Sequence, residues 1–121
     1  MISGIDHVQL AMPAGLEARA REFYSGVLGI PEVPKPVELA GRGGAWFESG
    51  TVKIHLGVEP DFRPAKKAHP GLLVDNLSEL VRLLMDSGHH VRLENSYQAY
   101  VNDPFGNRIE LIQSGELKGT G

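Results

Sequence analysis

The sequence predicts an α+β fold built from two paired βαβββ modules, each about half of the chain. Two observations carry this prediction. The order strand, helix, weak strand, hairpin occurs once along the 121 residues and then again. A histidine lies on the first strand of each copy, His7 and His69, and the last strands read VKIHL and NRIEL. The length fits one compact domain, with 41% apolar residues to form its core.

Module one, residues 4–58, shows a strand pattern, a helix pattern and then a hairpin pattern. IDHVQLAM alternates apolar and polar residues, and the apolar residues that follow recur at helical spacing up to Gly29. A Pro- and Gly-rich loop then precedes two strands joined by Ser49-Gly50. The predicted elements are a strand over 5–12, a helix over 16–28, at most a short edge strand within 30–44, and a hairpin of 45–48 with 51–58.

A polar connector, residues 59–68, leads to module two, residues 69–113. Asn76 can cap its helix, with Glu79 at capping-box spacing, and Gly88 ends it. DPFGN supplies the turn of the last hairpin, and the polar tail is expected to be poorly ordered. The predicted elements are a strand in HPGLLV, a helix over 77–87, a strand near 91–93, a hairpin of 99–102 with 108–112, and the tail 114–121.

The composition excludes several classes of function. Lys and Arg number 12 against 15 Asp and Glu, and this net charge of −3 argues against nucleic acid as a partner. Without cysteine, the chain has no disulfide framework, thiolate zinc site or cysteine nucleophile. No apolar run approaches the roughly 20 residues of a membrane span, and MISGIDHVQL lacks the features of a signal peptide. We therefore expect a soluble, cytoplasmic protein with no membrane partner.

The overlay of the modules equates His7 with His69, and His55 with Glu110. In IHL and IEL the flanking Ile and Leu point to the opposite face, so His55 and Glu110 occupy equivalent places on one face. Polar side chains at strand centres need a reason, because an unpaired buried charge is costly. A divalent metal supplies one, since three imidazoles and a carboxylate suit Zn, Ni, Fe, Co or Mn.

Each of these residues also has a simpler interpretation. A lone strand histidine more often packs or faces solvent than binds a metal. Glu110 can pair with Arg108 or Lys53, which share its face. His89 and His90 follow a helix end, where a cation complements the helix dipole, and are expected at the surface. The ligand interpretation is favoured because the repeat pairs all four positions.

Three segments, IDHVQLAM, EFYSGVLGI and DPFGNRIELI, resemble the vicinal oxygen chelate superfamily. This superfamily includes glyoxalase I, bleomycin-resistance proteins, fosfomycin-resistance transferases and extradiol dioxygenases, and the resemblance covers residues 4–113. It implies a glyoxalase-like fold, in which curved, mostly antiparallel sheets surround a metal cleft, and a homodimer whose sites combine strands of both chains. It also implies His7, His69 and Glu110 as the metal ligands. His55 stands where glyoxalase I-like enzymes have a second glutamate.

These observations lead us to expect a metal-dependent enzyme of the glyoxalase-like lyase or isomerase class, acting on a small oxygen-rich substrate. The metal would act as a Lewis acid, and Glu110 would move the proton. His55 in place of the second glutamate argues against lactoylglutathione isomerisation. The alternatives are an antibiotic-resistance protein, either a fosfomycin-type transferase or a bleomycin-type sequestering binder, and a small dioxygenase. The candidate substrate-pocket residues are Gln9, Trp46, Tyr100 and Arg108.

Overall fold

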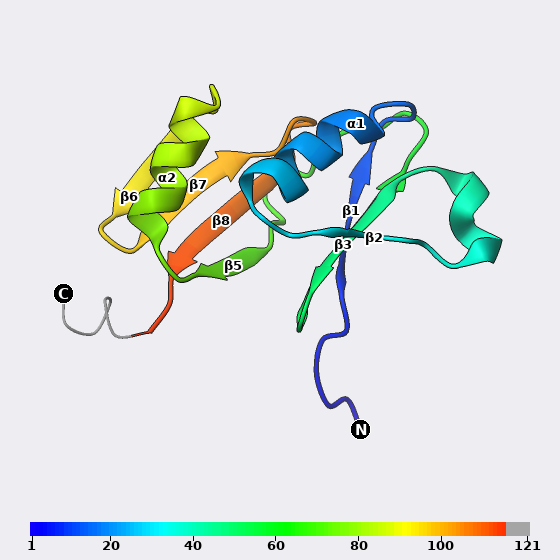
Figure 1. Cartoon of the computed structure of the whole chain (residues 1–121), viewed down its shortest axis with the longest axis horizontal. Coiled ribbons are helices and arrows are strands. Elements are labelled where there is room, and N and C mark those ends of the chain that lie inside the picture. The colour runs from blue at the N-terminus through cyan, green and yellow to red at the C-terminus, as the bar shows by residue number, and fades with distance from the viewer. Residues whose placement is uncertain (116–121) are drawn as a thin grey trace. The chain divides into compact units, whose positions relative to one another are not determined.

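The computed structural model describes residues 1–115 and divides into two compact units. The first runs from Met1 to Pro64 and the second begins at Ala65, so the division falls within the predicted connector 59–68 (Figure 1). The tail 114–121 is predicted to be poorly ordered, and residues 116–121 of it lie outside the described part of the chain. Each unit contains its own four-stranded sheet.

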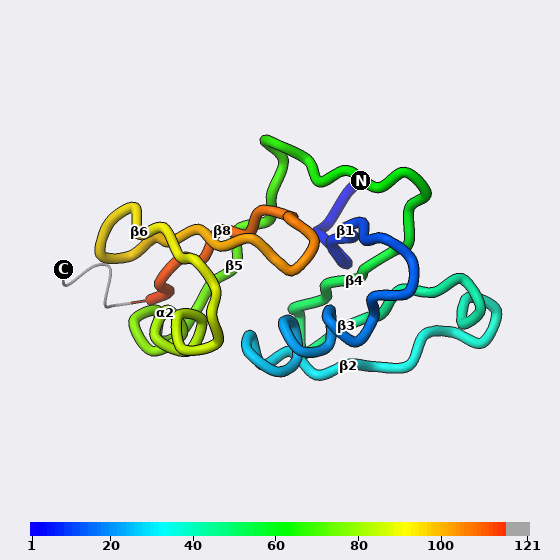
Figure 2. Tube along the Cα trace, turned by 90° about the horizontal axis from the view of Figure 1, so that it is seen from above, coloured from blue at the N-terminus to red at the C-terminus, as the bar shows by residue number. Residues whose placement is uncertain are grey.

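The first unit has the order strand, helix, strand, strand, strand. Its strands lie in the order β1-β4-β3-β2, and β1 runs parallel to β4 beside it while the other pairs are antiparallel (Figure 2). The elements are β1 Val8–Met12, α1 Glu17–Ala20, the π-helix η1 Arg21–Val27, β2 Glu32–Val33, the 3-10 helix η2 Val37–Arg42, β3 Ala45–Ser49 and β4 Val52–Val58.

Several boundaries differ from the prediction. The first strand begins at Val8, so His7 precedes it, and the tight turn lies at Gly50-Thr51 rather than Ser49-Gly50. The predicted helix widens into a π-helix, in which the N–H of Leu28 donates to the carbonyl of Phe23. Two adjacent aromatic residues of this π-helix, Phe23 and Tyr24, are both buried.

The buried face of the first sheet packs against the helix. Phe47 from β3 lies 5.4 Å from the Tyr24 ring, and Ile54 and Leu56 from β4 are almost completely buried. The residues between them on each strand point the other way, because side chains alternate along a strand. The sheet therefore has one apolar face under the helix and one opposite face that carries the polar residues.

The second unit repeats this plan with one regular helix. Its strands lie in the order β5-β8-β7-β6, with β5 parallel to β8, and α2 lies across one face of the sheet (Figure 1). The elements are β5 Gly71–Val74, α2 Leu77–Asp86, β6 Val91–Asn95, β7 Gln98–Asn102 and β8 Arg108–Gln113.

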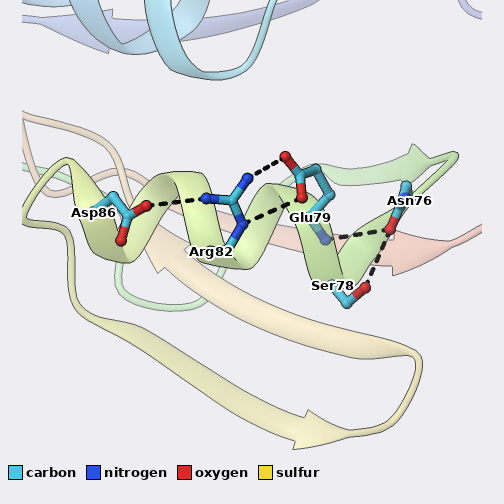
Figure 3. A network of polar contacts seen from close by, with 5 residues as sticks. All are labelled: Asn76, Ser78, Glu79, Arg82 and Asp86. Carbon is cyan, nitrogen blue, oxygen red and sulfur yellow. Dashed lines mark hydrogen bonds and ion pairs between the residues drawn. The ribbon is translucent and has the colours of Figure 1, made fainter.

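Asn76 caps α2 as predicted. Its side-chain oxygen accepts a hydrogen bond from the Glu79 backbone N–H at 3.2 Å (Figure 3). The Glu79 carboxylate does not complete a capping box but pairs with Arg82, which also contacts Asp86. The Arg82 guanidinium is thus already paired with two carboxylates on the exposed side of the helix.

The DPFGN turn between β7 and β8 is organised by the buried carboxylate of Asp103. One of its oxygens accepts the backbone N–H groups of Phe105 at 2.9 Å and Asn107 at 2.8 Å, and the other accepts the Asn107 side-chain amide at 2.9 Å. Gly106 takes a positive φ of 95° in this turn. The turn fixes where β8 begins, and therefore which side chains Arg108 and Glu110 meet on β7.

The predicted fold class is confirmed: two βαβββ units form an α+β fold with mixed, mostly antiparallel and open sheets. The strand pairing also agrees with the overlay of the modules. Gln9 pairs with His55 in one sheet, and Gly71 pairs with Glu110 in the other. His7 stands two residues before Gln9, as His69 stands two residues before Gly71. Within residues 1–115, none of the helices has the length and apolar character needed to span a membrane.

Candidate functional site

The polar face of each sheet carries one row of candidate site residues. In the first unit the row runs across three strands through Gln9, His55 and Trp46. In the second unit the corresponding row runs through Gly71, Glu110 and Tyr100. The register therefore brings a predicted ligand beside a predicted pocket residue in both units.

In the second unit, the His69 and Glu110 side chains meet directly. His69 Nε2 lies 3.1 Å from Glu110 Oε1, and the other carboxylate oxygen accepts a hydrogen bond from the Gln98 amide at 2.8 Å. The His69 ring also contacts the Tyr100 ring edge to face, with centroids 5.8 Å apart. Both members of the pair are mostly buried, with side chains 24% and 14% exposed.

A backbone hydrogen bond decides which nitrogen of His69 carries the proton. His69 Nδ1 lies 2.8 Å from the Lys67 carbonyl oxygen, which can only accept, so Nδ1 must donate. In the neutral ring, Nε2 then presents a lone pair to the Glu110 carboxylate, and two acceptors face each other at 3.1 Å. Such a contact is favourable only when a cation, either a proton on Nε2 or a metal ion, lies between the two groups.

In the first unit, three aromatic rings form a stack. His55 lies parallel to Trp46 with centroids 3.8 Å apart, and His7 stacks on His55 at 4.4 Å. His55 is buried, and its Nε2 donates to Glu48 at 2.7 Å, so this nitrogen is already used. Gln9 pairs with His55, and its side chain lies over Gly57. A Cβ added to Gly57 would come within 2.5 Å of the amide nitrogen of Gln9.

The tautomer of His7 is set by its neighbour in the sequence. His7 Nδ1 donates to Asp6 at 2.9 Å. This hydrogen bond holds the pKa of the Asp6 carboxyl below its ordinary value, and the positive charge of Lys53 lowers that pKa further. A carboxylate that orients a histidine through Nδ1 is the usual support for a metal ligand that binds through Nε2.

The second unit offers two adjacent donor atoms that fit one ion. With ligand bonds of about 2.0–2.2 Å, neighbouring donors in a tetrahedral or octahedral site are about 2.8–3.6 Å apart. The 3.1 Å separation of His69 Nε2 and Glu110 Oε1 falls in this range. Over residues 1–115, no group of three or more His, Asp or Glu side chains that could hold a metal comes together. The four predicted ligands are found instead as two pairs, one in each unit.

A pocket of about 550 Å³ lies beside the second row. Arg92 on β6 and Arg108 on β8 both stack on the Tyr100 ring of β7, with guanidinium carbons 4.7 and 4.5 Å from its centroid. The pocket is lined by His90, Arg92, Tyr100, Val101, Asn102 and Arg108.

The sequence interpretation missed the partners of its candidate residues. Asp6 and Glu48 orient His7 and His55, and Gln98 orients Glu110. The sequence could have indicated Asp6 as a partner of His7, because Asp6 directly precedes it. For Glu48 and Gln98 the indication is weaker, since strand alternation places them on the polar faces but cannot identify their partners.

The arginine pair had no local signal. Arg92 meets Tyr100 only because β6 pairs with β7 in the observed register, and Arg108 meets it only because β8 lies on the other side. Arg108 itself was a candidate for the substrate pocket, and the structure locates it in this pocket together with Tyr100. His90 lies at the surface as expected, and at the same pocket.

No family model and no curated protein matches the sequence, whereas solved structures do. A Bacillus anthracis protein described as a glyoxalase family protein is 46% identical, with a TM-score of 0.89 over 95% of this chain and 98% of that one. A glyoxalase/dioxygenase from Nostoc punctiforme is 20% identical (TM-score 0.74, 93% of this chain and 92% of that one). The fosfomycin resistance protein FosX from Mesorhizobium loti is 15% identical (TM-score 0.74, all of both chains). These two support the fold alone. With the 46% identical relative matched over nearly its full length, this chain belongs to the glyoxalase family of the vicinal oxygen chelate superfamily.

Proposed function

We propose that this chain is a metal-dependent enzyme of the glyoxalase-like lyase or isomerase class, acting on a small oxygen-rich substrate. The observation that carries the proposal is the contact between His69 Nε2 and Glu110 Oε1. Because Nδ1 donates a hydrogen bond to the Lys67 carbonyl, the neutral His69 ring turns the lone pair of Nε2 toward the carboxylate, and a divalent cation is a natural partner for both groups.

His7 is the proposed third ligand. Its Nδ1 is held by Asp6, which leaves Nε2 free to bind, and its side chain is 41% exposed. His55 was predicted as a fourth ligand, and we now propose a supporting role for it. Its Nε2 is bonded to Glu48, and its ring stacks on His7, so it can hold the His7 ring in place without binding the metal.

A bound zinc, nickel, iron, cobalt or manganese ion would supply Lewis-acid chemistry, polarising an oxygen of the substrate. Glu110 is the residue proposed to move a proton. Gln98 donates to one of its oxygens and fixes the plane of the carboxylate, which orients the carboxylate for proton transfer. Gln9, Trp46, Tyr100 and Arg108 remain the proposed contacts to the substrate.

The proposal is tested by metal analysis of the protein purified without chelator. We expect about one divalent ion per chain, and a loss of at least about 100-fold in metal affinity for His69→Ala and Glu110→Gln. His89→Gln serves as the matched control, since it removes a histidine that follows α2. A chain that carries no metal, or whose metal affinity is unchanged by both substitutions, would remove the basis of the enzyme proposal and favour a non-catalytic binder.

The proposed homodimer with shared sites has a separate test. His7→Ala and Glu110→Gln chains, each inactive in metal binding, are refolded together in equal amounts. If each site takes His7 from one chain and Glu110 from the other, random pairing restores about one quarter of the sites, because half of the dimers are mixed and each has one intact site. No recovery, or only monomers in light scattering at micromolar concentration, would contradict sharing.

A further inference from the structure

The pocket beside Tyr100 carries two positive charges, and only one of them has an ion-pair partner among residues 1–115. Arg108 has no carboxylate within ion-pair distance among residues 1–115, and Arg92 has only Glu94, at 3.6 Å on the exposed surface. None of the residues that line the pocket is acidic. Arg82 on α2 gives the contrast, because its guanidinium contacts two carboxylates (Figure 3).

The two guanidinium groups are also held close together. Neither guanidinium carbon is more than 4.7 Å from the centroid of the same Tyr100 ring. Their separation is therefore below about 10 Å, which is the Debye length at 0.1 M salt, so salt screens their repulsion only in part. The tyrosine ring compensates some of this repulsion through its π face, and an anion bound in the pocket that both groups line would compensate more.

We infer that this pocket binds a tetrahedral oxyanion, such as the phosphate group of a small molecule. Each guanidinium presents a planar pair of donors that fits two oxygens. A planar carboxylate has only two oxygens and can satisfy one such pair, whereas a phosphate group has enough oxygens for both. His90 and Asn102 offer further donors at the same pocket, whose 550 Å³ lies in the size range of small-molecule sites.

The position of the pocket links it to the proposed metal centre. The Tyr100 ring contacts the His69 ring edge to face, and both arginine guanidinium groups lie over the same Tyr100 ring. An oxyanion held by the arginines would thus be the second anchor of a substrate whose reacting end lies at His69 and Glu110. The assignment of this group to the substrate rests on the proposed function, but the binding of the anion does not.

The test is an NMR titration of the full chain with inorganic phosphate, at constant ionic strength, with acetate as the planar comparison. We expect saturable shifts of Arg92, Arg108 and Tyr100 signals with phosphate, and weaker binding of acetate. Each of Arg92→Gln and Arg108→Gln should weaken phosphate binding about tenfold, as expected for one charged hydrogen-bonding partner. Arg108→Lys should recover only part of this loss, because it restores the charge without the planar donor pair.

Arg82→Gln is the matched control, since it removes the same charge from the same unit but outside the pocket. Equal weakening by Arg82→Gln would indicate general charge attraction and would overturn the inference, as would the absence of saturable shifts. His69→Ala separates the two proposals. If His69→Ala abolishes phosphate binding while both arginine variants retain it, the anion binds at the metal centre and the inference fails. If phosphate binds as expected but the chain holds no metal, only the proposed function fails.

Discussion

Replacing Asp103 by Asn tests how the structure holds the DPFGN turn. The Asp103 carboxylate is only 4% exposed and accepts three hydrogen bonds, two from backbone N–H groups and one from the Asn107 amide. In Asp103→Asn the two hydrogen bonds from backbone N–H groups keep an acceptor oxygen, but that oxygen is no longer charged, which costs about 1 kcal/mol for each bond. The third is lost, because two amide donors would then face each other, at a cost of about 1 kcal/mol or more. The expected total is about 3 kcal/mol in the free energy of unfolding.

The assay is urea and thermal unfolding, followed by circular dichroism at neutral pH. For a chain of this length, about 3 kcal/mol corresponds to a decrease in Tm of roughly 10–15 °C. Asp61→Asn is the matched control, since Asp61 is exposed in the connector and is expected to change Tm by no more than about 2 °C. If Asp103→Asn behaved like this control, the carboxylate would not organise the turn, and the account of how β8 is positioned would be wrong.

Two further predictions concern the loop before β3. The N–H of Gly44 donates to Glu17 at 2.9 Å and holds the pKa of that carboxyl below its ordinary value of 4.5. Since the pKa is lower in the folded state, this stabilisation is present above about pH 4.5 and is lost as the pH falls through the folded pKa. Glu17→Gln should cost about 0.5–1 kcal/mol at neutral pH after solvent screening, and should flatten the acid limb of the stability curve; an unchanged limb would contradict the assignment. Gly44→Ala should destabilise by about 3 kcal/mol or more, because its φ is +82° and a Cβ would lie 2.1 Å from the Leu56 carbonyl oxygen. Gly15→Ala has the same strain at φ +83° with no atom within 4 Å, and should cost only about 1–2 kcal/mol, so equal losses in urea unfolding would refute the steric argument.

Strand periodicity alone was sufficient for much of the fold. The alternation in VKIHL and RIELI determines which side chains pack under a helix, and this depends only on the local geometry of a strand. The caps and stops of α2 are also local, since Asn76 and Gly88 act through the backbone within a few residues of themselves. The shift of the first tight turn to Gly50-Thr51 left the faces intact, because it moved the pairing by an even number of residues.

The internal repeat also predicted which site residues are equivalent, namely His7 with His69 and His55 with Glu110. It could do so because equivalent residues of two similar modules occupy equivalent places, and the register of β1 with β4 and of β5 with β8 agrees with that. It could not identify the partners of these residues. Only the folded chain shows that the Lys67 carbonyl sets the tautomer of His69. Only the folded chain shows that the Glu48 carboxylate accepts the hydrogen bond of His55 Nε2.

The sequence by itself therefore determined the two modules, the polar face of each sheet and the candidate ligands on those faces. Only the tertiary structure decided that Arg92 and Arg108 meet on one tyrosine ring, that His55 Nε2 donates to Glu48, and that His69 Nε2 faces the Glu110 carboxylate. The physical reason is the range of the interactions. Periodicity and capping act over a few residues, whereas charge pairs and hydrogen-bond partners across strands depend on a register set by pairing between distant segments.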